Sequence, residues 1–181
     1  RYETLGKDYG LAIIPCELID DNGDKLREVL NRLAKKRNRE EGFIDYINHS
    51  CHYTSTLVDR IVPGFPRDEF DKLCQEYGYI DNNRDKGEYF HFYVLKEEPF
   101  VEEKFPVDKV GLHAVYVKDV HPYKQRKVRI LNGSHTSLVP VAYLCGYDEV
   151  RQSLLDERIR KFLEEEQQKE ILPTLTAEGS E

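Results

Sequence analysis

The sequence is informative first for what it lacks: its 181 residues include no methionine and no tryptophan, and only four cysteines. No apolar run approaches the roughly 18 residues that a membrane-spanning helix needs, and the longest extends only from Leu11 to Pro15. The first residues show neither the basic start nor the apolar stretch of a signal peptide. These absences argue against a membrane protein, and the missing methionine indicates a piece of a longer chain.

Positive charge is also in deficit, because 27 lysines and arginines stand against 34 aspartates and glutamates, for a net charge of −7. A nucleic-acid-binding surface would be basic and clustered, so we expect no nucleic-acid partner. The cysteines, Cys16, Cys51, Cys74 and Cys145, lie far apart and form no C-x-x-C pair. Such spacing is typical of reduced cysteines in a cytoplasmic protein.

Three common fingerprints are missing too. The sequence contains neither G-x-G-x-x-G nor G-x-x-x-x-G-K-[ST], the glycine-rich loops that cradle nucleotide phosphates. It also contains no G-x-S-x-G, the usual signal of a serine hydrolase. No nucleotide-binding fingerprint is therefore present within these residues.

The apolar pattern predicts strands and helices in alternation over the first part of the chain. Residues 9–19 form a near-continuous apolar run, typical of a strand covered on both faces. Pro15 favours an edge position or the end of that strand. We expect the charged segment 97–109 to stay outside the core. The other expected elements are a helix that starts at residues 20–23 and ends near 37, helices 41–48 and 68–77 (the second capped by Asp68), a β-branched stretch 53–61, and strands 89–95 and 111–117.

The last part of the chain is predicted to be helical. Residues 123–144 are apolar enough for a buried helix, and residues 148–171 fit one long, highly charged helix that Pro173 ends. The expected fold class is therefore α/β, followed by a mostly α region.

Three polar side chains stand out on the first of these two helices. At about 100° per residue, Lys127, Asn132 and His135 share one face, and Lys124 lies on the same side. Desolvation on a buried face would suit a lysine to proton transfer, and a neutral imidazole and an amide beside it can donate to one substrate oxygen. The same spacing also fits a stripe that faces solvent, or a network of hydrogen bonds between helices.

Two other groups are weaker candidates. His49, Cys51 and His52 could bind a metal, although zinc sites usually need four spaced ligands and no second half-site follows. Asp59 beside Arg60, within an apolar stretch, is either a structural ion pair or part of a site.

The motif K-V-R-I-L-N-G-S-H-T, residues 127–136, resembles the signature of the polyol-specific long-chain dehydrogenase/reductase family. That family includes mannitol dehydrogenases and hexuronate reductases. Two further segments agree with it in order and spacing: I-P-C-E-L-I-D-D-N-G at residues 14–23, and S-T-L-V-D-R-I-V-P-G-F-P-R-D-E at residues 55–69. The resemblance extends over residues 9–172.

This resemblance implies an enzyme that transfers a hydride between NAD and a sugar acid or polyol, a small-molecule substrate, without a catalytic metal. It implies the end of a Rossmann-type NAD-binding domain over residues 1–118. The start of a helical substrate domain would then follow over residues 119–181.

The resemblance also assigns roles to residues. Lys127 matches the family's general acid/base, and Asn132 and His135 match the residues that hold and polarise the reacting oxygen. Asp59 matches an aspartate near the substrate. The substrate carboxylate needs a cation, and Lys124 is our candidate by its place on the helix.

Two departures qualify the match. Leu18 stands where mannitol dehydrogenases have an asparagine that assists the reacting oxygen. The family's glycine-rich loop is absent, so the cofactor-binding residues are unknown and we expect these 181 residues alone not to form a competent dehydrogenase. The choice between NAD and NADP, the exact substrate and the oligomeric state stay open.

Other functions remain as alternatives. One is a non-catalytic acidic interaction module, in which Lys127, Asn132 and His135 form a structural polar network. The others are a dehydrogenase for a related polyol or for fructuronate, and a metal hydrolase built on His49 and its neighbours.

Overall fold

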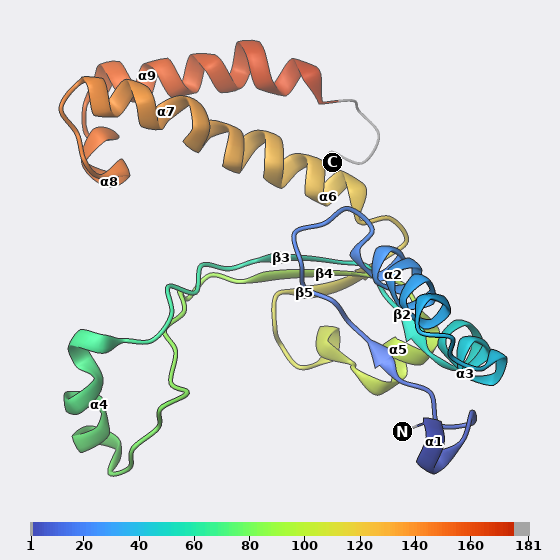
Figure 1. Cartoon of the computed structure of the whole chain (residues 1–181). Helices are drawn as coiled ribbons and strands as arrows, with labels where there is room; N and C mark the ends of the chain where they lie inside the picture. Colours follow the sequence, from blue (N-terminus) through green and yellow to red (C-terminus); the bar gives the residue numbers. More distant parts are fainter. Residues whose placement is uncertain (1, 176–181) are drawn as a thin grey trace. The chain divides into compact units, whose positions relative to one another are not determined.

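The computed structural model describes residues 2–175, which divide into two compact units between Lys118 and Asp119 (Figure 1). The first unit combines strands with helices, and the described part of the second is helical. None of the helices within the described residues is long and apolar enough to cross a membrane.

The first unit contains two small sheets. In one, β1 (Ala12–Ile13) and β2 (His52–Tyr53) run parallel. In the other, β4 (Phe92–Lys96) lies between β3 (Thr56–Asp59), to which it is antiparallel, and β5 (Ala114–Val117), to which it is parallel. Parallel neighbours need a crossover connection, and helices supply it here. The described helices of this unit are α1 (Tyr2–Leu5), α2 (Asn22–Lys36), α3 (Glu41–Asp45) with a π-helical turn at Tyr46–Ser50, α4 (Phe70–Tyr77) and α5 (Pro99–Lys104), with 3₁₀ turns at Arg67–Glu69 and Val107–Lys109. Of these, α2 and α3 lie in the connection from β1 to β2, and α5 lies in the connection from β4 to β5.

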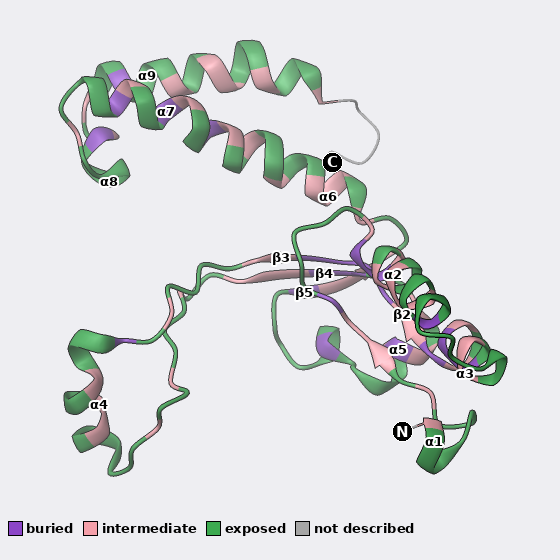
Figure 2. Ribbon diagram, in the orientation of Figure 1, coloured by how far each residue is buried: buried purple, intermediate pink, exposed green. Residues whose placement is uncertain are grey.

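The core of this unit is centred on β4, where Val94 and Leu95 are fully buried (Figure 2). Leu95 packs with Val107 and Ala114 in one apolar cluster. The prediction that segment 97–109 stays outside the core is therefore wrong. This segment is amphipathic, because α5 buries Val101 completely while Glu103 and Lys104 are exposed.

The strand predicted over residues 9–19 is also much shorter than expected. β1 ends at Ile13, and Pro15, which has no N–H to donate to a sheet, follows it. Beyond it the chain turns outward, and Leu18 is 81% exposed. The predicted helix start at residues 20–23 is confirmed, since α2 begins at Asn22.

The predicted cap of the next helix is wrong. Asp68 lies inside the 3₁₀ turn Arg67–Glu69, and α4 begins only at Phe70, without a side-chain cap at Glu69. The predicted helix at 41–48 is confirmed, although its second half is π-helical. The predicted strands 89–95 and 111–117 are confirmed with later starts, as β4 and β5.

The second unit pairs two helical stretches side by side (Figure 1). The first stretch, which we call the rod, joins α6 (His121–Arg126), a π-helical turn at Lys127–Asn132 and α7 (Gly133–Leu144). The second joins α8 (Val150–Ser153) to α9 (Glu157–Glu166), which continues into a π-helical turn at Gln167–Ile171 and a 3₁₀ turn at Leu172–Thr174.

Both helix predictions for this unit need correction. The helix expected at 123–144 forms, but it is not buried: only Ser134, Leu138 and Ala142 of the rod are buried, the last two against Ile159 of α9. The single long helix expected at 148–171 is interrupted before Asp156, whose side chain caps α9 by accepting a hydrogen bond from the Arg158 N–H.

Candidate functional site

Four of the predicted site residues lie on the rod of the second unit. Lys124 belongs to α6, Lys127 and Asn132 are the first and last residues of the π-helical turn, and His135 lies in the first turn of α7. The two lysines are half-buried, whereas Asn132 and His135 are exposed. The prediction of a buried polar face is therefore wrong for Asn132 and His135, because α9 packs against other positions of the rod.

The π-helical turn changes the backbone hydrogen-bond pattern around these residues. In an ideal α-helix, residues five apart such as Lys127 and Asn132 point about 140° away from each other. Here the Gly133 N–H donates to the carbonyl of Val128, five residues earlier. Such a bond closes a wider ring than the bond to the fourth residue back in an α-helix. Single π-helical turns often occur at functional sites.

A ladder of side-chain hydrogen bonds follows the π-helical turn. Ser134, His135, Thr136 and Ser137 each donate to the carbonyl oxygen four residues earlier, those of residues 130–133. For His135 the bond joins Nδ1 to the carbonyl oxygen at 2.8 Å, and for Thr136 it joins Oγ1 to the carbonyl oxygen at 2.9 Å. Serine, threonine and histidine side chains thereby satisfy backbone groups beside the irregular turn. The run S-H-T-S thus fixes the orientation of His135.

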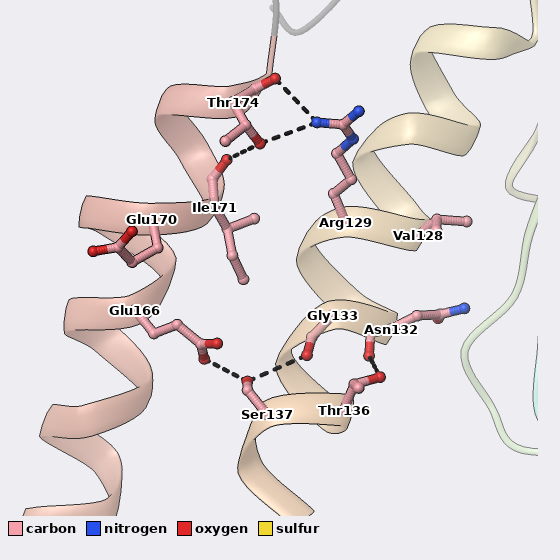
Figure 3. Close-up of a pocket in the computed structure, with 10 residues that line it drawn as sticks. All are labelled: Val128, Arg129, Asn132, Gly133, Thr136, Ser137, Glu166, Glu170, Ile171 and Thr174. Carbon is pink, nitrogen blue, oxygen red and sulfur yellow. Dashed lines mark hydrogen bonds between the residues drawn. The ribbon is translucent and has the colours of Figure 1, made fainter.

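A groove of about 520 Å³ lies between the rod and the α9 stretch (Figure 3). Ser137 Oγ donates to the carboxylate of Glu166, and Arg129 donates from one nitrogen to the carbonyl and hydroxyl oxygens of Thr174, at 3.1 and 3.0 Å. Asn132 borders the groove, but its amide points away from α9 (Figure 3). The sequence pattern gave no signal for this groove. Its lining is Val128, Arg129, Asn132, Gly133, Thr136, Ser137, Glu166, Glu170, Ile171 and Thr174.

The remaining predicted site residue, Asp59, belongs to the first unit. It ends β3, opposite Phe92 in the antiparallel ladder, and is half-buried. The structure therefore brings Lys124, Lys127 and their neighbours together on one rod and holds Asp59 at a strand end of the other unit.

Tyr53 and Tyr93 are among the tyrosines of the first unit whose pKa is raised. Burial raises the pKa of Tyr53 to about 12, and burial together with a hydrogen bond to Cys16 raises the pKa of Tyr93 well above its usual range. The Cys16 sulfur and the Tyr93 hydroxyl are 3.3 Å apart. Both phenols therefore stay protonated at neutral pH, and neither is suited to act as a base.

The residues of the metal alternative do not come together. The imidazole of His49 lies 2.7 Å from Asp45, that of His52 lies 2.9 Å from Glu98, and Cys51 is buried. Within residues 2–175 no three histidine, cysteine, aspartate or glutamate side chains are placed to share an ion. The metal-hydrolase alternative therefore finds no site in the part of the chain that the structure describes.

The helix start that follows β1 is not a phosphate cradle. The Gly23 N–H at the beginning of α2 donates to Ser55 Oγ at 3.2 Å. A Cβ at Gly23 would lie 2.7 Å from the carbonyl carbon of Thr54, so this glycine allows close packing of the chain on itself. Dinucleotide sites need open N–H groups at a helix start. The start of α2 therefore does not form a pyrophosphate site.

Two family models match the chain. The mannitol dehydrogenase Rossmann domain matches residues 1–109, and the mannitol dehydrogenase C-terminal domain matches residues 119–181. Curated relatives include the altronate oxidoreductases of Escherichia coli O6:K15:H31 (strain 536 / UPEC) and of Shigella flexneri, each 46% identical over 168 residues. These matches cover 93% of this chain but 35% of each relative. The chain thus spans about a third of the length of the relatives it matches.

Solved structures agree with these matches. A D-sorbitol dehydrogenase in substrate-free form is 27% identical, with a TM-score of 0.74 over 92% of this chain and 34% of its own. The mannitol 2-dehydrogenase of Pseudomonas fluorescens, solved as a ternary complex with NAD and D-mannitol, is 25% identical, with a TM-score of 0.64 over 92% of this chain and 33% of its own. The predicted fold class, a Rossmann-type part followed by a helical part, is thereby confirmed.

Proposed function

Because the chain belongs to the mannitol dehydrogenase family, as its motifs predicted, we propose that the whole protein is a cytoplasmic, NAD-dependent oxidoreductase that interconverts D-tagaturonate and D-altronate. Relatives named altronate oxidoreductase, 46% identical to this chain, support the substrate. A relative solved with NAD supports the cofactor. The observation that carries the proposal is the rod, which presents Lys127, Asn132 and His135 within a few turns of one helix.

Each residue of the rod has a proposed part in the reaction. Lys127 is the general acid/base: its ammonium gives a proton to the oxygen in the direction of the alcohol, and its neutral amine takes that proton in reverse. The Asn132 amide and the His135 imidazole hold the same oxygen as negative charge develops on it. Lys124 binds the substrate carboxylate, and Asp59 of the first unit binds the substrate.

The two units have proposed roles in the whole protein. Residues 1–118 form the end of the NAD-binding domain, and residues 119–181 form the start of the substrate domain. Since the sequence has no glycine-rich loop and the start of α2 is not a pyrophosphate cradle, the cofactor is bound with residues beyond this chain. We expect these 181 residues alone to bind NADH more weakly than the whole protein. Equal affinity, measured by fluorescence titration, would contradict this.

Lys127→Ala in the whole protein tests the proposal. General acid–base catalysis typically contributes about 10²–10⁴-fold, so turnover should fall at least about a hundredfold. Lys161→Ala is a matched control, because Lys161 is an exposed lysine of α9. Its ion pair with Glu165 is long, at 3.9 Å, and is exposed to solvent. The control should keep native turnover. A loss below about tenfold for Lys127→Ala would refute the assigned role.

A non-catalytic interaction module is the alternative, and the missing glycine-rich loop favours it. In that case the polar residues of the rod would form only a structural network. The whole protein would then show no turnover at all, and Lys127→Ala would change stability alone.

A further inference from the structure

We infer that Arg60 and Glu88 are positioning residues, which fix the chain directly after Asp59 by holding a bulge in the opposite strand. This role rests on the proposed function, in which Asp59 binds the substrate. Arg60 and Glu88 act through Asp59, the last residue of β3, and not on the reacting atoms.

The bulge interrupts the ribbon in which β3 and β4 continue as two legs toward α4 (Figure 1). The ladder ends where the last residue of β3 faces Phe92, and the next hydrogen bond between the legs joins the Glu88 N–H to the Ile61 carbonyl at 3.0 Å. Between these points only Arg60 lies on the β3 leg, whereas residues 89–91 lie on the β4 leg. The β4 leg therefore carries extra residues opposite the end of β3. Bulges bend a strand, redirect side chains and are frequent beside active sites.

Burial does not hold this bulge, because its aromatic side chains face solvent. Tyr89 is 100% exposed and Phe90 is 51% exposed. Hydrogen bonds hold it instead: Arg60 Nε donates to the Glu88 carbonyl oxygen at 3.1 Å, and the Ile61 N–H donates to Glu88 Oε1 at 2.6 Å. Arg60 and Glu88 thus close the bulge at the end that faces α4.

His91 fastens the other end of the bulge. Its Nε2 atom accepts from the His113 N–H, and its Nδ1 atom donates to the Tyr89 carbonyl oxygen, both at 3.2 Å. A backbone N–H only donates and a carbonyl oxygen only accepts, which sets the roles of the two ring nitrogens. The β4 leg is thereby tied to the residue that precedes β5.

Gly87 leaves the space that the guanidinium of Arg60 needs. A Cβ at Gly87 would lie 3.1 Å from Arg60 Nε and 3.2 Å from its Cζ. Because Arg60 directly follows Asp59, the bonds that hold Arg60 also fix the end of β3. We therefore expect their loss to displace the Asp59 carboxylate and to weaken substrate binding.

Binding of D-tagaturonate to the whole protein in the presence of NAD tests this without turnover, because two oxidised partners cannot react with each other. In calorimetry, Glu88→Ala should raise the dissociation constant by about tenfold. Glu88→Gln keeps an oxygen that can accept from the Ile61 N–H, so it should stay within about twofold of native affinity. Glu76→Ala, at an exposed glutamate of α4, is the matched control and should also stay within about twofold. Native affinity of Glu88→Ala would refute the positioning role.

A double-mutant cycle shows whether Glu88 acts through Asp59. In an Asp59→Ala background, Glu88→Ala should change the dissociation constant by less than about twofold, because the side chain that it positions is gone. Equal effects of Glu88→Ala in both backgrounds would refute the positioning role alone. If circular dichroism shows that Glu88→Ala does not fold, Gly87→Ala takes its place in the cycle, since it displaces the guanidinium without removing a polar group. Failure of the native protein both to bind and to reduce D-tagaturonate would refute the proposed function, and the positioning role with it.

Discussion

Replacing Asn22 by alanine should destabilise the first unit strongly, because its side chain is a buried junction between two segments. Asn22 is 3% exposed. Its amide nitrogen donates to the carbonyl oxygens of Pro15 and Thr56, each at 3.2 Å, and its amide oxygen accepts from the Thr56 N–H at 2.8 Å. The Asn22 side chain therefore links Pro15, in the loop after β1, to Thr56, the first residue of β3, through hydrogen bonds.

The magnitude follows from which partners lose their hydrogen bonds. The Thr56 N–H is buried and would have no acceptor, which costs about 1–3 kcal/mol. The carbonyl of Pro15 keeps the hydroxyl of Thr56 as a donor, so its loss is partial and adds about 1 kcal/mol. We therefore expect Asn22→Ala to lower the free energy of unfolding by about 2–4 kcal/mol.

Denaturant titration followed by circular dichroism measures this loss as a fall in midpoint at an unchanged slope. Asn83→Ala is the matched control, since Asn83 is exposed in the turn after Asp81 and its side chain is outside any buried network. The control should stay within about 0.5 kcal/mol of the native protein. If Asn22→Ala is as mild as the control, the reasoning about this junction is wrong.

Two further predictions concern the backbone and an acidic cap. Gly10→Ala should disrupt the pairing of β1 with β2, because its Cβ would lie 1.5 Å from the Ser50 carbonyl oxygen. In contrast, a Cβ at helical Gly133 would make only ordinary van der Waals contacts at 3.7 Å, so Gly133→Ala should stabilise the fold by about 0.5–1 kcal/mol in thermal unfolding. Hydrogen bonds from Arg158 lower the pKa of Asp156, so their stabilisation is full above the ordinary carboxyl pKa and is lost as pH falls through the lowered value. The melting temperature of Asp156→Asn should therefore approach the native one in acid, and a constant gap across pH would contradict this.

The sequence predicted those features that depend on local periodicity. Helix α2 was predicted because Leu26, Val29, Leu30 and Leu33 recur at helical spacing, and its start at Asn22 is confirmed. The burial of Val101 was missed, since the charged residues around it outweighed one apolar side chain in a composition argument. Its burial depends on how α5 packs in the folded unit, which periodicity over six residues does not reveal.

The site was predictable as a motif but not as a geometry. The motif placed Lys127, Asn132 and His135 on one helix, and the rod does carry all three. The π-helical turn was not predicted, because it depends on which backbone carbonyl each N–H selects. The hydrogen bond from His135 Nδ1 to the Leu131 carbonyl oxygen could not be predicted from the sequence either. Their roles in catalysis stay predictions.

The most direct test of the central claim is NADH oxidation by the whole protein, offered D-tagaturonate, D-fructuronate and D-fructose side by side. We expect rapid oxidation with D-tagaturonate alone. Absence of oxidation with all three would contradict it and favour the interaction module, and oxidation with D-fructuronate or D-fructose instead would contradict the assigned substrate.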